Sequence, residues 1–448
     1  MRFSELEGAS IGVWGAGREI RSFARQLARR LPAAQIAVAA FDAPAEPGVA
    51  EILRSPGVQI VSGAAVQPAL AACELIVRSP GVSIHRPELR ALRELGIPVT
   101  TATALWLAER GGEGVIGVTG TKGKSTTAAL LCHLLRATGR EVRLAGNIGV
   151  PALDLLDEDP GLAAVVELSS FQIADLAVGP QVAVITNLFR EHLDWHGTED
   201  AYRAEKLRLL ELPGVRVAVL SAREQPLRRL KPAMPVRRYG SPEGWDAVGG
   251  GIARAGELVL DGAELPLRGE HNALNVCAAL TAVEAFGAEP PPLPAALEGF
   301  AALPHRLQTV AEHAGVAWVN DSISTTPEST LAALESFPGC ELVLIAGGQD
   351  RGQDFSALAA ALAERGVTLV AVPSTGPRLL AAAREAGVPA ERAVQAADLA
   401  GAVAAAGALA GPAGVVLLSP AAPSYDNYRD FEERGERFAA LAREQAGG

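Results

Sequence analysis

A glycine-rich stretch at residues 117–127, GVTGTKGKSTT, constrains this 448-residue chain more than any other feature. The apolar run GVIGV precedes it, and leucines at helical spacing follow it. A glycine turn between a strand and a helix points backbone N–H groups at an anion. Lys124 adds a positive charge, and the hydroxyl of Ser125 can ligate Mg²⁺. The stretch therefore predicts a loop that binds the phosphates of a nucleotide triphosphate.

The loop departs from the common phosphate-loop pattern GxxxxGK[ST] in the spacing of its glycines. Val118 stands where that pattern has its first glycine, and Gly117 and Gly120 flank it instead. The variant is GxxGxxGKS, and it still supplies a flexible turn, a lysine and a hydroxyl. The residues expected to contact the triphosphate here are Gly120, Thr121, Gly123, Lys124, Ser125 and Thr126.

Short apolar runs alternate with Ala- and Leu-rich helical patterns along the whole chain, which predicts an α/β fold with mostly parallel sheets. A chain of 448 residues is too long for one core, so its length predicts two to three domains, and the restart of the α/β pattern after the proline-rich stretch favours three. They are a Rossmann-like N-terminal domain (1–98), a central P-loop ATPase domain with a mostly parallel sheet (99–303) and a Rossmann-like C-terminal domain (304–448).

Composition and motifs exclude several classes of function. The formal net charge of −11 argues against nucleic-acid binding, because phosphate backbones are held by an excess of Lys and Arg. The four cysteines form no CxxC pair and the histidines form no HExxH motif, so no zinc site is indicated. No long uninterrupted apolar run predicts a membrane span, and the first residues offer no secretory signal. We therefore expect a cytoplasmic protein.

The N-terminal segment carries a broken dinucleotide fingerprint. GAGREI begins like GxGxxG with Gly15 and Gly17, but Ile20 replaces the third glycine. Asp42 ends the next strand-like run, and Ser79 begins a second turn, SPG. A ligand of the nucleotide type is one interpretation, because an acid in that position suits a ribose or base. A tight strand-to-helix turn that binds nothing is the other.

Two stretches of the central segment carry groups that can serve a phosphate site. Glu167 ends the apolar run VVE, where its carboxylate can ligate Mg²⁺ or cap the next turn through a serine. His192 belongs to the polar cluster EHLDWHG, which a surface turn would also produce. Lys206 lies on an expected amphipathic helix, and the pattern by itself favours a solvated charge.

Later motifs can contact a nucleotide from other directions. Asn272 and Asn275, three residues apart, share one face of an expected helix, where they can bind a base or ribose; capping by Asn272 is the alternative. Arg306 and Asp321 begin the third domain. They suit a site that closes on its substrate, and an ion pair at a domain interface is the alternative.

Together, these motifs resemble the Mur ligase family, the ATP-dependent amide-bond formers of peptidoglycan precursor synthesis. The resemblance covers essentially the whole chain, and it implies roles in cell-wall biogenesis, cell shape and cell division. The motifs that carry it, in the family's order, are GTKGKS, ELSSFQ, EHLDWHG, YRAEK, HNALN, LPHR and NDS. Within the family the chain looks like the ligases that add glutamate to UDP-N-acetylmuramoyl-L-alanine through an acyl phosphate.

The resemblance implies a role for each domain and for the candidate residues. The N-terminal domain binds the UDP portion, the central domain binds ATP, and the C-terminal domain brings the amino acid. Lys206 matches the lysine that the family carbamylates, which supports a second Mg²⁺ beside His192; the first is held by Ser125 and Glu167. The ATP contacts also include Asn272, Asn275, Arg306 and Asp321. The residues matched to the UDP substrate are Gly15, Gly17, Asp42, Ser79 and Asn147. The catalytic set is Lys124, His192, Lys206 and Arg306.

The departures from the family pattern lie in the expected amino-acid pocket. Where D-glutamate ligases read NDSKATN, this chain reads NDSISTT, which places Ile323 at a lysine position; Arg351 stands at a second lysine position. Lys and Arg differ in reach and in hydrogen-bond geometry. Thr325, Ser424 and Phe431 match pocket positions. The pattern resembles the subgroup that adds L-glutamate, whose product needs a separate epimerase.

Other functions stay open on the sequence alone. The same reaction with D-glutamate is the main alternative. A folylpolyglutamate synthetase-like ligase shares the central fold, but the UDP-type N-terminal segment argues against it. A phosphate-loop switch protein would carry a guanine-reading NKxD motif, which is not found, and a dehydrogenase would rest on the broken GAGREI turn alone. We expect a monomer whose small-molecule partners are the UDP substrate and glutamate.

Overall fold

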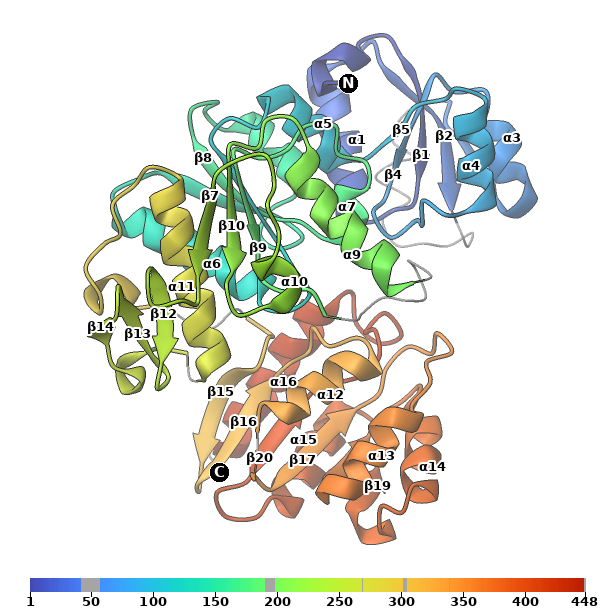
Figure 1. Cartoon of the computed structure of the whole chain (residues 1–448). Coiled ribbons are helices and arrows are strands. Elements are labelled where there is room, and N and C mark those ends of the chain that lie inside the picture. The colour runs from blue at the N-terminus through green and yellow to red at the C-terminus, as the bar shows by residue number, and fades with distance from the viewer. Residues whose placement is uncertain (42–56, 190–197, 268, 301–303, 338, 447–448) are drawn as a thin grey trace. The chain divides into compact units, whose positions relative to one another are not determined.

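The computed structural model describes residues 1–41, 57–189, 198–267, 269–300, 304–337 and 339–446. The chain divides into two compact units, Met1–Phe300 and Ala301–Gly448, and each is described by itself. The first unit holds two parallel sheets and a small antiparallel one, and the second unit holds one mixed sheet (Figure 1). This is the expected α/β architecture.

The N-terminal sheet has the strand order β3-β2-β1-β4-β5, and every neighbouring pair is parallel. Such a sheet with helical connections is the Rossmann-like arrangement that the sequence predicted. Its strands are β1 (Ser10–Trp14), β2 (Gln35–Phe41), β3 (Gln59–Ser62), β4 (Leu75–Arg78) and β5 (Val99–Thr100). Its helices are α1 (Arg18–Arg30), α3 (Val66–Leu70) and α4 (Pro87–Glu94), and α5 (Ala102–Arg110) leads to the central sheet.

The central sheet has the order β11-β10-β9-β6-β8-β7 and is parallel throughout. Its strands are β6 (Val115–Thr119), β7 (Val142–Gly146), β8 (Ala163–Glu167), β9 (Val182–Ile185), β10 (Val217–Ser221) and β11 (Val236–Tyr239). Its helices are α6 (Lys124–Ala137), α7 (Ser170–Ile173), α9 (Glu199–Leu207), α10 (Gln225–Arg228) and α11 (Glu270–Ala285). An antiparallel sheet of β12 (Trp245–Val248), β13 (Gly251–Arg254) and β14 (Glu257–Leu260) was not foreseen.

The C-terminal unit has the order β15-β16-β20-β17-β18-β19, in which only β15 is antiparallel to its neighbour. The strands are β15 (Gln308–His313), β16 (Val316–Asn320), β17 (Leu342–Ala346), β18 (Thr368–Ala371), β19 (Ala393–Gln395) and β20 (Val415–Leu418). The helices are α12 (Pro327–Glu335), α13 (Ser356–Arg365), α14 (Gly376–Glu385), α15 (Leu399–Leu409) and α16 (Phe431–Ala446). The apolar runs at β16, β17 and β20 were predicted as strands; β15, β18 and β19 were not.

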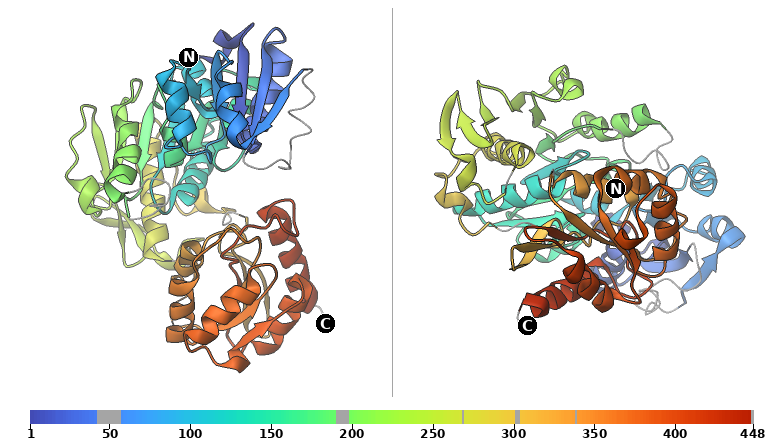
Figure 2. Two further views of the ribbon diagram at one scale, coloured as in Figure 1. Left: turned by 90° about the vertical axis from the view of Figure 1, so that its right-hand side faces the viewer. Right: turned by 90° about the horizontal axis from the view of Figure 1, so that it is seen from below.

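Alternation along the strands explains why helices cover both faces of the C-terminal sheet (Figure 2). Leu342 and Leu344 of β17 belong to one apolar cluster, and Val343 and Ile345 belong to another on the opposite face. The strand is therefore buried on both sides, which is why its sequence is a continuous apolar run.

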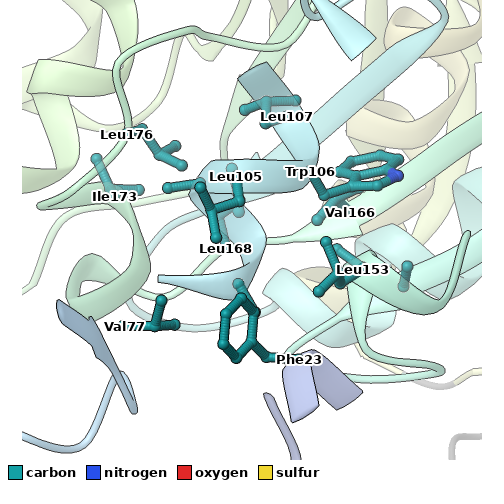
Figure 3. Packing of buried hydrophobic residues seen from close by; sticks show 14 of the residues in the cluster. Phe23, Val77, Leu105, Trp106, Leu107, Leu153, Val166, Leu168, Ile173 and Leu176 are labelled. Carbon is teal, nitrogen blue, oxygen red and sulfur yellow. The ribbon is translucent and has the colours of Figure 1, made fainter. Parts of the chain in front are cut away.

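One apolar cluster joins the N-terminal and central sheets (Figure 3). Phe23 and Val77 come from elements of the N-terminal sheet, and Leu168, Ile173 and Leu176 come from the central segment. All five are at most 1% exposed. The two sheets of the first unit thus share a core. The domain boundaries at residues 98 and 303 stay predictions.

Among the described residues, no helix is long and apolar enough to cross a membrane.

Candidate active site

The phosphate loop follows β6, which lies between β8 and β9 in the central sheet, and leads into α6. Gly120 has φ +146°, and a Cβ on it would lie 1.9 Å from Thr186 Oγ1. Gly123, the N-cap of α6, has φ +77°, and a Cβ on it would lie 2.4 Å from Asn275 Oδ1. Both positions therefore require glycine for conformation and for space.

Two residues at the end of β9 hold this loop, and neither was among the predicted site residues. The side-chain oxygen of Asn187 accepts hydrogen bonds from the N–H groups of Thr121 (3.1 Å) and Lys122 (2.7 Å). The hydroxyl of Thr186 donates to the carbonyl of Lys122 at 2.7 Å. The available clue was the polar pair Thr-Asn directly after an apolar strand, because strand ends of a parallel sheet meet at one edge.

The positively charged groups near the loop are held by protein contacts. The ammonium of Lys124 donates to the carbonyl of Thr121 at 2.8 Å. The hydroxyls of Thr121 and Tyr202 lie 3.0 Å apart, and Tyr202 is on α9. The ammonium of Lys206 lies 4.8 Å from the centre of the Tyr202 ring. Lys206 is only 2% exposed, so the preference for a solvated charge was wrong; its helix packs that face inward.

Glu167, the last residue of β8, is buried beside the start of the loop. It is aligned with Val118 of the neighbouring β6 and is 1% exposed. Its Oε1 accepts a hydrogen bond from Asn147 Nδ2 at 3.1 Å, whereas Oε2 has no hydrogen-bond partner among the described residues. An unsatisfied buried carboxylate oxygen fits a bound cation.

The residues predicted to ligate Mg²⁺ are Ser125, Glu167, His192 and carbamylated Lys206. Ser125 is 3% exposed at the first turn of α6, so its hydroxyl and Glu167 lie at the same edge of the sheet. His192 lies outside the described residues. Within the described part of the chain, no group of three or more His, Cys, Asp or Glu side chains could hold a metal. Protein oxygen atoms from Ser125 and Glu167 are compatible with Mg²⁺ that also binds phosphate.

The two asparagines of α11 face the loop. Asn275 Nδ2 donates to Asn272 Oδ1 at 3.2 Å, and Thr127 Oγ1 donates to Asn275 Oδ1 at 3.2 Å. The N-cap of α11 is Gly269, so Asn272 does not cap the helix. The pair forms a polar face against the first turn of α6.

Three of the predicted UDP-substrate residues, Gly15, Gly17 and Ser79, meet at the edge of the N-terminal sheet. A Cβ on Gly15 would lie 2.7 Å from Ser79 Cβ, and one on Gly17 would lie 3.0 Å from Ser79 Oγ. Gly17 is the N-cap of α1, and Ile20, where the fingerprint has glycine, is fully buried. Asn147 lies at the other sheet, on Glu167. Asp42 lies outside the described residues.

In the second unit, Asp321 is a buried acid with a network of its own. It is 3% exposed, and its carboxylate accepts hydrogen bonds from Ser419 Oγ (2.8 Å) and from the N–H of Leu307 (3.3 Å). Burial raises its pKa to about 6 against the opposing effects of Ser324, Ser419 and the charge of Arg306. The Nε atom of Arg306 is buried without a hydrogen-bond partner among the described residues.

The predicted glutamate residues lie on three loops of the second unit and at the first residue of α16. Arg434 of α16 connects two of these loops: its guanidinium donates to Ser322 Oγ (3.0 Å), to Ser322 O (2.8 Å) and to Ala422 O (3.0 Å). Ser322 in turn donates to the carbonyl of Phe431 at 2.8 Å. Ile323, Thr325 and Phe431 are partly buried and Ser424 is buried.

The third of these loops carries Arg351, which is exposed. Its guanidinium lies 5.7 Å from the centre of the Tyr425 ring, the residue after Ser424. Its Nε donates to Gln349 Oε1 at 3.1 Å. The structure thus places a cation next to the loop of Ser424.

Comparison with known proteins gives matches to three family descriptions in order along the chain. Residues 10–101 match the "Mur ligase MurD-like, N-terminal domain", residues 118–283 the "Mur ligase middle domain" and residues 305–422 the "Mur ligase, glutamate ligase domain". A UDP-N-acetylmuramoyl-L-alanine--L-glutamate ligase of Xanthomonas campestris pv. campestris is 43% identical over 99% of this chain and 97% of its own. The chain belongs to the Mur ligase family.

Other Mur ligases extend the comparison. A relative of the same description from Micromonospora sp. is 42% identical, over 100% of this chain and 99% of its own. Two solved structures from Thermotoga maritima share the fold: the UDP-N-acetylmuramate-alanine ligase MurC (19% identity, TM-score 0.59, 98% and 100% covered) and the MurF ligase in complex with ADP (17%, 0.57, 100% and 97%). The chain is therefore an ATP-dependent, amide-bond-forming ligase of peptidoglycan precursor synthesis. The family uses ATP and Mg²⁺.

Proposed function

We propose that this Mur ligase adds L-glutamate to UDP-N-acetylmuramoyl-L-alanine, consuming ATP. The observation that carries the proposal is a glycine loop with Lys124 beside the buried, partly unsatisfied Glu167, in a chain whose full length matches ligases of that description. Ile323 and Arg351, where D-glutamate ligases have lysines, support the L-isomer.

The proposed reaction has two steps. The alanyl carboxylate of the UDP substrate attacks the γ-phosphorus of ATP, an O–P bond forms, and ADP leaves. The amine of glutamate then attacks the resulting acyl phosphate, loses a proton, and expels inorganic phosphate as the amide forms. Charge neutralisation by Lys124 and Arg306 accelerates the first step, because the negatively charged carboxylate must approach the negatively charged γ-phosphate.

We assign the nucleotide contacts to the loop and to the α11 asparagines. The backbone N–H groups of residues 120–126 bind the β- and γ-phosphates, and Asn187 keeps that loop in place. Asn272 and Asn275 bind ATP from α11. Ser125 and Glu167 hold one Mg²⁺, which neutralises phosphate charge when bound. Asp321 and Arg306 act from the C-terminal domain.

Lys206 is proposed to be carbamylated and to support a second Mg²⁺ with His192. The residue is 2% exposed, and its amine would form a carbamate by adding CO₂ and releasing a proton. The addition converts a buried cation into an anion with two oxygen ligands.

The domain roles follow from the same assignment. Residues 1–98 bind the UDP portion through Gly15, Gly17, Asp42 and Ser79, with Asn147 from the central domain; residues 99–303 bind ATP; residues 304–448 bind glutamate. In the last domain, Thr325, Ser424 and Phe431 contact glutamate beside Ile323 and Arg351. We further propose that the protein is a cytoplasmic monomer and that an epimerase acts on its L-glutamyl product.

One experiment tests the reaction and its stereochemistry. The protein is incubated with ATP, Mg²⁺ and UDP-N-acetylmuramoyl-L-alanine, with L-glutamate, D-glutamate or neither. Phosphate release and product mass are measured. We expect release that depends on L-glutamate, together with the mass of the glutamyl adduct. If phosphate release does not depend on glutamate, the ligase assignment is wrong. If the protein prefers D-glutamate, the assignment to L-glutamate is wrong.

The assignment of Lys206 has its own test. Lys206→Ala is expected to lower kcat by a factor on the order of 10³, because a metal-supporting anion is lost. Wild-type protein in ¹³C-labelled bicarbonate should show a carbamate resonance that the variant lacks. Lys231→Ala, at an exposed lysine, is the matched control and should keep full activity. Full activity of Lys206→Ala would leave this residue with a packing role only.

A further inference from the structure

Arg78 is a fully buried cation that connects the two parallel sheets of the first unit. It is the last residue of β4, it is 0% exposed, and it directly precedes Ser79. A guanidinium is expensive to bury unless charges and hydrogen bonds compensate it. Arg78 was not among the predicted site residues, because no residue near it in the sequence indicates its partner.

The partner is an acid of the central segment, nearly one hundred residues later in the chain. Arg78 Nη2 lies 2.7 Å from Asp175 Oδ2, and Asp175 is only 2% exposed. The same nitrogen donates to the carbonyl of Phe171, in α7, at 2.8 Å. Arg93 approaches the other carboxylate oxygen at 3.0 Å from a more exposed position. Burial raises the pKa of Asp175, and the charges of Arg78 and Arg93 oppose that rise.

The other end of the same guanidinium fixes the turn after β4. Nη1 donates to three carbonyls of that turn: Pro80 (3.0 Å), Val82 (2.7 Å) and, more weakly, Ser79 (3.3 Å). The turn packs on the glycine turn of β1, since Ser79 occupies the space that a Cβ on Gly15 would need. The planar guanidinium therefore links this turn to α7 through two different nitrogens, and the single ammonium of a lysine cannot make both sets of contacts.

Helix α7 begins three residues after Glu167, and its N-cap Ser169 is held by Gln172 in a capping box. Val77, next to Arg78, packs in the same apolar cluster as Leu168 and Ile173 (Figure 3). Arg78 thus links the Ser79 turn to the strand end that carries Glu167, next to a second buried polar contact in which Gln172 Nε2 donates to Glu19 Oε1 at 2.6 Å.

We propose that Arg78, with Asp175, is a positioning residue that fixes the place of the Ser79–Val82 turn relative to the phosphate-binding edge of the central sheet. The inference rests on the proposed function, in which this turn contacts the UDP substrate. The reacting carboxylate must be aligned with the γ-phosphate of ATP, and the turn and the loop belong to different sheets. Because Arg78 holds the turn through contacts within the protein, the turn keeps this position before substrate binds.

The test replaces the ion pair in two ways. Arg78→Lys keeps a cation beside Asp175 but loses the planar guanidinium. The double variant Arg78→Met and Asp175→Leu removes both charges and leaves no buried charge of this pair unpaired. Arg93→Met is the matched control, because Arg93 contacts the same carboxylate of Asp175 from a more exposed position. Steady-state kinetics for the UDP substrate and for ATP are measured, with thermal unfolding and binding of a fluorescent ATP analogue.

We expect kcat/KM for the UDP substrate to fall about 100-fold in the double variant and about 10-fold in Arg78→Lys, because a misplacement near 1 Å costs on the order of 10² in rate. The KM for ATP, analogue binding and the control's kinetics should stay within about twofold, as the loop itself is untouched. Unchanged kcat/KM in Arg78→Lys, an equal loss in Arg93→Met, or a parallel loss of ATP binding would overturn the proposal.

The outcomes separate this proposal from the proposed function. A wild-type protein without glutamate-dependent phosphate release contradicts the function, whatever the variants do. An active wild type with equally active Arg78 variants contradicts only the positioning role. If the double variant does not fold, Arg78→Lys decides the test alone.

Discussion

At the scale of single residues, Gly123 couples the phosphate loop to α11. Its φ is +77°, and a Cβ at this position would lie only 2.4 Å from Asn275 Oδ1, which leaves no room for a side chain. We predict that Gly123→Ala costs about 1–3 kcal/mol of stability through backbone strain and contact and also raises the KM for ATP, because Asn275 and its partner Asn272 must move. Thermal unfolding and ATP kinetics check both parts.

Gly139 provides the matched control for that substitution. It has φ +81°, close to that of Gly123, but no atom lies within 4 Å of a Cβ placed on it. Gly139→Ala should therefore show the cost of the backbone conformation alone, about 1–2 kcal/mol, with unchanged ATP kinetics. If the two variants had the same KM for ATP, the contact with Asn275 would have no part in nucleotide binding.

Asp321 makes the stability of the second unit depend on pH. Its folded-state pKa of about 6 lies above the ordinary 3.8, so the folded protein holds this proton more tightly than the unfolded chain. The stabilisation is complete below about pH 4 and is lost as the pH rises through about 6, amounting to about 3 kcal/mol for a pKa difference of about two. Asp321→Asn should remove this part of the pH dependence.

Urea unfolding read by pulse proteolysis, with fragments of residues 301–448 identified by mass, measures that dependence between about pH 4 and pH 7. The control is Asp350→Asn, since Asp350 is exposed and its pKa is lowered by a hydrogen bond from Gly352 and by Arg378. It should keep the wild-type slope. The same slope in Asp321→Asn would show that another group titrates there.

At the scale of elements, α16 stabilises the loops of the expected glutamate pocket. Arg434 near its start is 3% exposed and makes hydrogen bonds to Ser322 and Ala422 on two different loops. Arg434→Lys leaves at least one of the buried carbonyls without a donor, at a cost of about 1–3 kcal/mol. We predict a rise of about tenfold in the KM for glutamate, with the KM for ATP unchanged, measured by steady-state kinetics.

Arg437, one turn further along α16, is exposed and is the control for that substitution. Arg437→Lys should leave both KM values unchanged. An equal rise in the KM for ATP in Arg434→Lys would mean that α16 supports the whole unit and does not act on the glutamate pocket.

Elements with strong local patterns could be predicted from the sequence, and elements that depend on distant partners could not. The strand, turn and helix around Lys124 follow from glycine spacing and periodic leucines. The short strands β18 and β19 and the antiparallel sheet of β12, β13 and β14 have four residues or fewer each. Each of these short runs contains a polar residue, whereas the equally short β20 is entirely apolar and could be predicted.

The same difference separates the site residues. Glycines, Lys124 and Glu167 were visible because their chemistry is local to a turn or a strand end. The burial of Lys206 depends on how α9 packs, and Asn187 and Arg78 act on groups 65 or more positions away in the chain. No local pattern shows such a pairing. The roles assigned to the candidate residues stay predictions until the variants are measured.

At the scale of the whole molecule, the apolar clusters predict where the chain can be divided. Two clusters lie entirely between residues 307 and 442, and the other three lie entirely before residue 301. We predict that residues 304–448, expressed alone, fold with cooperative thermal unfolding and a circular dichroism spectrum of a mixed α/β domain. The fragment should have no ATPase activity, since the phosphate loop is absent from it.

Cutting the chain at the other predicted boundary, after residue 98, is the control, and we expect the resulting fragment not to fold stably. A fragment of residues 99–448 lacks Phe23 and Val77, which share a core with Leu168 and Ile173. It also leaves Asp175 buried without the charge of Arg78. The first loss exposes apolar surface, and the second leaves a buried charge unpaired. We therefore expect aggregation, or a melting temperature well below that of the same unit in the full chain. A fragment 99–448 as stable as the intact chain would mean that the N-terminal sheet adds nothing to the core of the central one.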